Sequence, residues 1–324
     1  MTVPRSGIWL GLSAALIAVM GLSLLTGRVW LSPLDWLAGD TRALIILELR
    51  LPRAVLGCVI GAGLGMAGAA MQGYLRNPLA DPGLFGVSSS AALGAVLSIF
   101  FGLTNSFWLL PAFALAGAAG AMGALALLVG RSGGLMVFTL AGVVLSSLTG
   151  ALTSLVISLA PSPFALSEIL TWLLGALTDR SWVDVALAAP LTALGMAVLW
   201  ASGRDLDALT LGEPAARSLG VHMSRLQAKL VIGIGLVVGA SVAAAGVIGF
   251  VGLIVPHLVR QLVGGQSSRV MPAAALAGAI LVVSADGVVR LAPGGSELRL
   301  GIAMSLLGAP FFLALLLRLR REVV

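Results

Sequence analysis

The chain has 324 residues, of which 59% are hydrophobic and 10% charged, and its formal net charge at pH 7 is +6. A mean hydropathy of +1.09 lies far outside the range of water-soluble domains. This composition excludes a soluble enzyme or a soluble binding module and predicts an all-α integral membrane protein.

About ten apolar segments follow one another along the chain, and most are long enough to cross a bilayer as helices. They lie at residues 7–27, 54–74, 88–103, 107–130, 135–158, 183–202, 229–250, 252–263, 271–289 and 300–317. The first lacks a small-residue cleavage site, so we expect a retained helix and not a signal peptide. The segment at 252–263 is short and contains Pro256, which predicts a broken or tilted helix. A further apolar piece at 169–177 is too short to cross and is expected at one surface. Residues 1–324 therefore form a single transmembrane domain.

The stretch GLGMAG at 63–68 has the glycine spacing of a dinucleotide-binding turn, with Asp81 as the acidic residue that such a site requires. A nucleotide site also needs a preceding strand, whereas these glycines lie within roughly 20 unbroken apolar residues. In a helix, Gly61, Gly65 and Gly68 would form a groove for a neighbouring backbone. The sequence therefore predicts helix packing here.

The basic residues are divided by topology and do not form one patch, which argues against nucleic-acid binding. With the amino terminus in the cytoplasm, 12 of the 19 basic residues fall on the inner side and 7 on the outer side, in agreement with the positive-inside rule. The outer arginines, including Arg28, are offset by outer carboxylates such as Asp35 and Asp40. Both termini are thus expected in the cytoplasm.

Two segments of the chain are similar to each other at an offset of 178 residues, most clearly in a shared proline and its distance from the glycines of the preceding helix. The first copy is Gly61, Ala62, Ala67, Gly68, Leu75, Pro78 and Gly86, and the second is Gly239, Ala240, Ala245, Gly246, Leu253, Pro256 and Gly264. The predicted topology makes the two copies inverted, as in transporters that work by alternating access.

Few residues carry chemistry. His222 and His257 are the only histidines and Cys58 the only cysteine, and no second ligand stands at metal spacing, so we expect no metal site and no disulfide. The only lysine, Lys229, belongs to no phosphate-binding loop, so no cofactor is expected on this chain. Asp286 lies near the outer end of its helix and is expected to be a satisfied structural carboxylate. A secondary carrier or channel driven by an ion gradient remains an alternative to an ATP-driven system at this point.

The one long inner loop, at 203–228, contains the short helical stretch EPAARSL, with Pro214 at a helix start and Gly220 as a stop. This stretch resembles the coupling loop of ABC importer permeases. The whole chain resembles the FecCD family of permeases in LRLPR at 49–53, in 68–95 around GYLRNPLADPG, in LGEPAARSLGV at 211–221, in AGVIGFVGLIVPHLVR at 245–260 and in LGAPFFLALLLR at 307–318. Where that family commonly has E-L-P-x-G, this chain has ELRLG, with Arg299 in place of proline.

The resemblance implies a homodimeric type II importer permease in the bacterial inner membrane, two ATPase subunits that hold ATP and Mg²⁺, and a periplasmic binding protein. It assigns ATPase coupling to Gly212, Glu213, Pro214, Ala215, Ala216, Arg217, Ser218, Leu219 and Gly220. Asn77 and Leu79 would narrow the cytoplasmic exit of the pore, although an Asn before Pro can also simply cap its own turn.

The resemblance also implies that Arg50, Arg53 and Arg290, at the outer helix ends, dock acidic residues of the binding protein, less so Arg299. The alternative is that these arginines extend to lipid headgroups. An apolar pore without fixed charge favours an iron chelate, either a siderophore or haem, over cobalamin, and the family includes importers of all three. The sequence leaves this substrate open.

Overall fold

The computed structural model describes residues 5–27, 30–32, 41–103, 106–130, 135–292 and 297–323, and within them every regular element is helical. Ten of the helices coincide with the ten predicted apolar segments, which confirms that prediction. They are α1 (Arg5–Leu25), α3 (Leu51–Leu75), α4 (Val87–Phe100), α5 (Leu109–Val129), α6 (Leu135–Ser158), α8 (Trp182–Trp200), α11 (Met223–Ala245), α12 (Val251–Val263), α13 (Ser267–Leu291) and α14 (Leu300–Val323). Eight helical stretches in the described ranges are long and apolar enough to span a bilayer, and α4 and α12 are shorter apolar helices.

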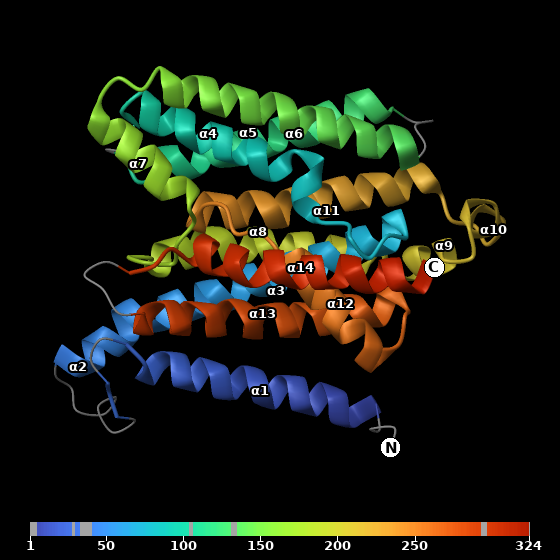
Figure 1. Ribbon diagram of the computed structural model, residues 1–324, viewed down its shortest axis with the longest axis horizontal. Helices are drawn as coiled ribbons and strands as arrows, with labels where there is room; N and C mark the ends of the chain where they lie inside the picture. Colours follow the sequence, from blue (N-terminus) through green and yellow to red (C-terminus); the bar gives the residue numbers. More distant parts are fainter. Residues whose placement is uncertain are drawn as a thin grey trace.

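Short helices lie at the two ends of the bundle (Figure 1). At one end are α2 (Thr41–Leu44), continued by the π-helix η2 (Ile45–Arg50), and α7 (Pro163–Leu173). At the other are α9 (Gly203–Leu209) and α10 (Glu213–Ser218), together with both chain termini. The polar α9–α10 pair and the termini therefore share one side, as the topology predicts. Arg28, Asp35 and Asp40, which that prediction also uses, lie outside the described residues.

The helix α3 runs through the middle of the bundle because it has almost no side-chain bulk on one face. A Cβ atom added at Gly61, Gly65 or Gly68 would collide with the carbonyl oxygen of Gly278, Ala274 or Gly252 respectively. Two of these partners are on α13 and one is on α12. The three glycines thus lie where neighbouring backbones approach most closely, and no phosphate-binding turn forms there.

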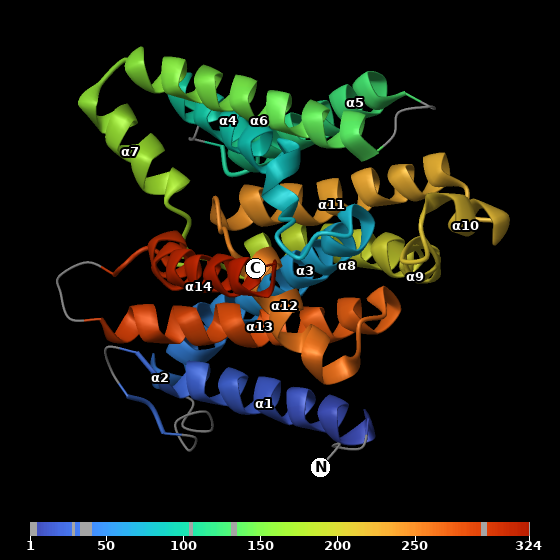
Figure 2. The same ribbon diagram turned by 45° about the vertical axis from the view of Figure 1, so that its right-hand side comes forward.

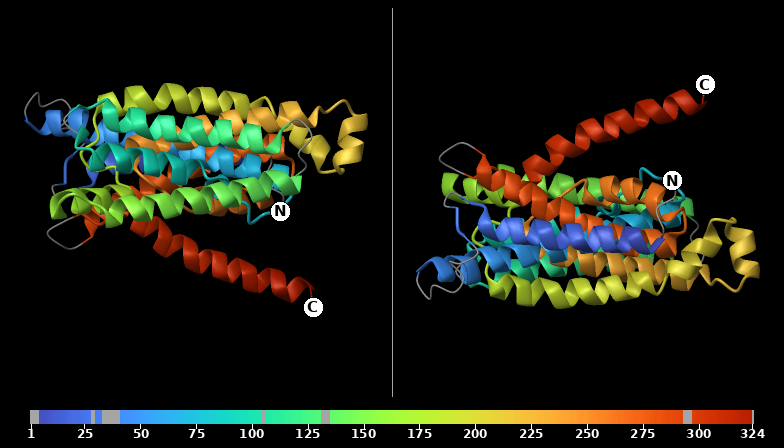
Figure 3. Two further views of the ribbon diagram at one scale, coloured as in Figure 1. Left: turned by 90° about the horizontal axis from the view of Figure 1, so that it is seen from above. Right: turned by 90° about the horizontal axis from the view of Figure 1, so that it is seen from below.

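In Figure 2, α4, α5 and α6 form one side of the bundle and α1 the other, with α3, α8, α11 and α13 between them. The helix α14 leans away from the bundle toward its carboxyl end, as both views in Figure 3 show. Large apolar side chains of α6 and α14 are exposed, among them Met136 at 75% and Leu313 at 59%. These two helices therefore keep apolar faces that this chain does not cover.

The helices α3 and α11 run in opposite directions, α3 starting at the end of the bundle that carries α2 and α11 at the end that carries α10 (Figure 1). This agrees with inverted copies, but the residue pairing at an offset of 178 is wrong. Pro78 lies in the turn after α3, whereas Pro256 lies inside α12. Gly68 is well inside α3, whereas Gly246 is the residue that follows α11. The match at this offset therefore reflects the similar composition of the two apolar segments, and it does not align the ends of α3 with the ends of α11.

Of the two alternatives predicted at Pro256, the broken helix is wrong, since α12 is one continuous helix, and the tilted helix stays a prediction. A proline inside a helix leaves the carbonyl four residues earlier without its usual N–H donor. Here that carbonyl belongs to Gly252, and it accepts a hydrogen bond from the Gln72 side chain at 3.3 Å. The side chain of Gln72, which is buried in α3, thus supplies the donor that Pro256 lacks.

Candidate functional sites

The α9–α10 pair projects from one end of the bundle and carries the predicted coupling residues. Gly212, with φ of +99°, ends the turn before α10, and Pro214 lies in the first turn of that helix, where its missing N–H costs no hydrogen bond. Glu213 and Arg217 form an exposed ion pair of 2.6 Å across one helical turn. Gly220, with φ of +89°, then reverses the chain. The sequence therefore folds into a short, capped helix at the predicted place.

The α9 helix anchors this projection to the membrane-spanning helices. Lys229 of α11 pairs with Asp205 at 2.9 Å. Asp207 accepts hydrogen bonds from the Ser268 hydroxyl and, at 3.1 Å, from the Ser268 backbone N–H at the start of α13. Leu206 of α9 is fully buried, whereas Leu211 and Leu219, which flank α10 in the chain, are 67% and 65% exposed. A force applied to α10 would thus pass through α9 into α11 and α13.

The turn that follows α3, at the end of the bundle that carries α10, contains the predicted gate residues. The backbone N–H of Leu79 donates to Oδ1 of Asn77 at 2.9 Å, which is the local cap that an Asn before proline can form. Asn77 is exposed and Leu79 is half-buried. The cap is consistent with a structural role, and gating by this pair stays a prediction.

A pocket of about 450 Å³ opens between α4, α6 and the segment that joins α11 to α12. Its lining combines apolar side chains with hydroxyl groups and includes one ionisable residue, Asp81. The hydroxyl groups belong to Ser88, Ser89, Ser146 and Thr153, and the apolar side chains include Ile248 and Phe250. Phe250 adopts a left-handed backbone with φ of +67°, and its ring lies against Gly308 of α14. No Arg, Lys or His is among the lining residues in the described part of the chain, in keeping with the predicted apolar pathway.

Asp81 begins the 3₁₀ helix η3 (Pro82–Phe85) at the inner edge of this pocket. Its carboxylate accepts a hydrogen bond of 2.7 Å from the backbone N–H of Gly83. Burial raises the pKa of Asp81 above its ordinary value, and the Gly83 hydrogen bond offsets only part of that shift.

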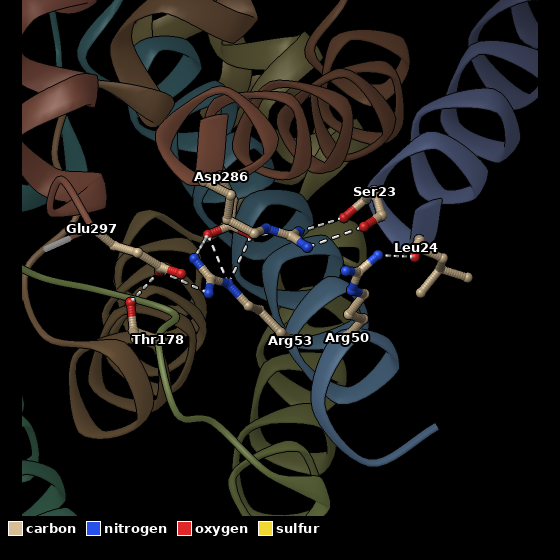
Figure 4. A network of polar contacts seen from close by, with 8 residues as sticks. Ser23, Leu24, Arg50, Arg53, Thr178, Asp286 and Glu297 are labelled. Atoms are coloured by element: carbon tan, nitrogen blue, oxygen red, sulfur yellow. Dashed lines mark hydrogen bonds and ion pairs between the residues drawn. The ribbon is translucent and has the colours of Figure 1, made fainter. Parts of the chain in front are cut away.

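At the opposite end of the bundle, Asp286 of α13 joins two buried arginines (Figure 4). Arg53 of α3 pairs with one carboxylate oxygen at 2.8 Å, and Arg290 pairs with the other at 2.6 Å. Arg290 also donates to the hydroxyl of Ser23 in α1 at 2.6 Å. The expectation that Asp286 is a satisfied structural carboxylate is confirmed.

The same network continues to the segments before α8 and α14. Glu297 pairs with Arg53 at 2.9 Å and accepts a hydrogen bond of 3.0 Å from Thr178. Partial burial favours the neutral acid, but the charge of Arg53 and the hydrogen bonds from Arg53 and Thr178 outweigh it and hold the pKa of Glu297 below its ordinary value. We call Arg53, Asp286, Arg290 and Glu297 the outer network.

The predicted docking arginines are not exposed in this structure. Arg50, Arg53 and Arg290 are 8%, 8% and 7% exposed, and Arg50 donates to the carbonyl oxygens of Leu24 and Leu25 at 2.9 and 3.0 Å. The expectation that they lie in the wet interface is wrong, because each guanidinium bonds within the chain. Contact with a binding protein stays a prediction for them, one that now requires the network to open.

Arg299, the residue in place of the family's proline, lines a different pocket at the same end, of about 550 Å³. Arg180, Glu168 and Asp179 also line it, and Arg180 lies 3.6 Å from Asp184. Glu297, two residues earlier, pairs with Arg53. The segment before α14 is therefore attached to the bundle at Glu297, while Arg299 lines the pocket. Ser23 and Thr178 could not be found from the sequence, because they bond to Arg290 and Glu297, which lie far away in the chain. Arg180 has its partner Asp184 only four residues away, but no local pattern marks the pocket that it lines.

Comparisons with known proteins describe what this chain is similar to. The FecCD transport family matches residues 15–318. The vitamin B12 import system permease protein BtuC of Vibrio cholerae is 42% identical, covering 93% of this chain and 91% of that protein. The Fe(3+) dicitrate transport system permease protein FecD of Escherichia coli is 35% identical, covering 94% and 97%. A solved structure of a metal-chelate type ABC transporter in an inward-facing conformation has 32% identity and a TM-score of 0.88, covering 97% and 99%.

Proposed function

This chain belongs to the FecCD transport family, and we propose that it is the transmembrane subunit of an ATP-driven importer that carries an iron chelate from a periplasmic binding protein into the cytoplasm. Similar permeases serve import systems for vitamin B12 and for ferric dicitrate. The observation that carries the proposal is the α9–α10 pair, since a permease that uses a partner's ATP needs a rigid surface on which that partner can act. The α9–α10 end would then face the cytoplasm, with both termini.

The proposed assembly contains two copies of this chain, two ATPase subunits and one binding protein. The exposed apolar faces of α6 and α14 are available either to lipid or to a second copy, and the pairing of two copies is inferred from the family. The pocket lined by Ser146 and Thr153 opens beside α6, so pairing along this face would place two such pockets around a shared pathway.

Closure of the ATPase dimer would push on α10 between Gly212 and Gly220. The ion pairs and hydrogen bonds of Asp205 and Asp207 would carry that movement to α11 and α13. The pocket beside α6 is bounded by the segment between α11 and α12, and α9 is linked to α11 through the pair of Asp205 and Lys229. This gives a continuous path of packed groups from the ATPase to the proposed pathway.

The proposed ligand class is a large iron chelate, either haem or a ferric siderophore. The pathway pocket presents hydroxyl and apolar groups and no basic side chain among its described lining residues, which suits a chelate of low net charge. Cobalamin is a second candidate, favoured by the 42% identity to a vitamin B12 permease. Uptake of radiolabelled haem, a neutral ferric siderophore and cobalamin into proteoliposomes, each with its cognate binding protein, would distinguish them.

The function itself is tested by reconstitution of the chain with its ATPase. We expect the chain to purify with an ATPase subunit and substrate uptake to stop when that subunit loses its catalytic glutamate. A secondary carrier would instead transport along an ion gradient without the ATPase. Uptake that continues with the inactive ATPase and collapses with an ionophore would overturn the proposal.

A further inference from the structure

The helices α5 and α11 separate toward the end of the bundle that carries α10, and they leave a groove of about 450 Å³. Its walls are almost entirely apolar, and its floor is the ring of a residue near the start of α6. The residues that define it are Met122, Ala126, Val129, Phe138, Val231 and Ile232. This groove belongs neither to the pathway pocket nor to the outer network.

The groove exists because the two helices are wedged apart. They touch closely at Gly239, where an added Cβ would lie 2.8 Å from that of Ala118. One turn further, the sulfur of Met122 fills the space over Gly235. Beyond Met122 the filling stops, and a Cβ added at Gly123 would meet no atom within 4 Å. Described side chains of this chain therefore leave the groove open.

The position of the groove in the membrane determines what can fill it. Both walls belong to helices that are long and apolar enough to span the bilayer. A water molecule needs two to four polar partners, and away from Ser224 and Gln227 the lining side chains are apolar, so hydrocarbon is the filling expected along most of the groove. Ile232 on the rim is 49% exposed, so the groove is open to the surroundings of the helices.

A polar end marks where a lipid headgroup would lie. Ser224 lines the groove at the start of α11 and is exposed, and Arg225 beside it is also exposed. Helical periodicity places Arg225 along the same edge of α11 as Ala228 and Ile232. A hydroxyl and a guanidinium at the mouth of an apolar groove match a phosphodiester followed by an acyl chain.

We propose that this groove holds one acyl chain of a glycerophospholipid from the leaflet at the α10 end, with the lipid phosphate at Ser224 and Arg225. The chain would run along α5 toward Met122. A second copy of this protein is a less suitable occupant, because a groove of about 450 Å³ accepts a flexible acyl chain more readily than a helix of about 10 Å diameter.

The floor of the groove connects the lipid to the inner turn. The ring of Phe138 packs edge-to-face against that of Tyr74, with 5.5 Å between the ring centroids, and its centroid lies 4.7 Å from that of Phe85. Gln227, which lines the groove, donates to the Tyr74 hydroxyl at 2.6 Å. Tyr74 lies in the last turn of α3, shortly before the turn that holds Asn77. An acyl chain in the groove would therefore support the spacing of α5, α11 and α3 that is seen here.

Two glycines of α5 provide a matched test. Gly123 faces the groove, whereas Gly120 does not line it, and an added Cβ meets nothing within 4 Å at either site. Gly123→Leu should place its side chain in the groove, and Gly120→Leu makes the same chemical change outside it. Native mass spectrometry of the intact complex, incubated with phosphatidylglycerol or phosphatidylethanolamine, measures the retained lipid.

We expect the Gly123→Leu complex to lose most of its retained lipid, because the leucine side chain would occupy the space that the acyl chain needs. Gly120→Leu should bind lipid like the wild type. On the wild-type complex, a phospholipid with a diazirine in its acyl chain should label residues 122–129 and 224–232. Equal lipid retention in both variants, or labelling elsewhere only, would overturn the proposal. So would a Gly123→Leu protein that keeps its lipid and loses its dimer, because the groove would then be a subunit contact.

Discussion

Asp286 shows how strongly a buried charge depends on its partners. Its carboxylate pairs with both Arg53 and Arg290, Glu297 supplies the second negative charge, and the Asp286 side chain is 2% exposed. Asp286→Asn keeps the shape but leaves two buried guanidinium groups with too little negative charge. We expect a loss of about 3–5 kcal/mol of stability, as for other broken buried pairs. The measurement is the thermal unfolding midpoint of the purified protein in detergent.

The exposed pair on α10 is the control for this variant. Glu213 and Arg217 have side chains that are 36% and 65% exposed, and such pairs contribute at most about 1 kcal/mol. Glu213→Gln should therefore leave the unfolding midpoint nearly unchanged. If Asp286→Asn were as stable as Glu213→Gln, the outer network would not hold the helices together.

Gly65 provides a test of the packing groove. A methyl group there would press on the carbonyl of Ala274, and neither backbone can move without disturbing α3 and α13. Gly65→Ala should cost about 1–3 kcal/mol and lower the yield of folded protein. Gly120→Ala, in open space on α5, should be neutral or stabilising by up to about 1 kcal/mol. The yield of folded protein is measured by size-exclusion chromatography and the stability by the unfolding midpoint. Equal yields and midpoints for the two variants would refute the close packing of α3 against α13 at Gly65.

Whole helices could be predicted from the sequence because each long apolar run carries its own signal. The continuous α12 could not, because the donor that compensates for Pro256 comes from Gln72 on another helix. The burial of Arg50, Arg53 and Arg290 was missed for the same reason. An arginine at a helix end looks exposed in a linear sequence, and only the tertiary fold brings Asp286 and Ser23 beside it. The α10 helix was predictable because Pro214 and Gly220 mark its ends locally.

The α10 helix should lose its partner when its charges are exchanged. Glu213→Arg combined with Arg217→Glu keeps an ion pair within the helix, so the fold of this chain should persist. The order of the two charges that α10 would present to an ATPase cleft is reversed, and we therefore expect the ATPase subunit to dissociate during purification. The check is the ATPase to permease ratio after affinity purification, together with an unchanged unfolding midpoint. An intact complex with normal uptake would make α10 an ordinary solvated helix.

The segment before α14 is held to the bundle by Glu297, and that link should depend on pH. Folding lowers the pKa of Glu297 below its ordinary value of 4.5, so the link contributes stability above the unfolded pKa and loses it as the pH falls through the folded pKa. Between about pH 6 and pH 3.5, the wild-type midpoint should therefore fall more steeply than that of Glu297→Gln. The partial exposure of Glu297 keeps the difference small. Parallel curves for the two proteins would exclude this contribution.

The two polar ends of the molecule differ, since the α10 end projects an exposed helix while the opposite end buries Arg50, Arg53 and Arg290. A binding protein approaching the outer end would meet Arg299 before it meets Arg53, because Arg299 lines an open pocket and Arg53 is enclosed. Charges at the rim of an interface mainly set the rate of association and its dependence on salt.

Arg299→Gln should therefore lower binding-protein association at low ionic strength, and the loss should shrink as salt screens the wild-type attraction. Arg53→Gln should instead lower the unfolding midpoint, and the protein that remains folded should bind like the wild type at either ionic strength. Surface plasmon resonance on detergent-solubilised complex, corrected for the folded fraction, measures both. If folded Arg53→Gln loses salt-dependent association while Arg299→Gln keeps it, then the outer network opens on docking and its arginines contact the binding protein directly.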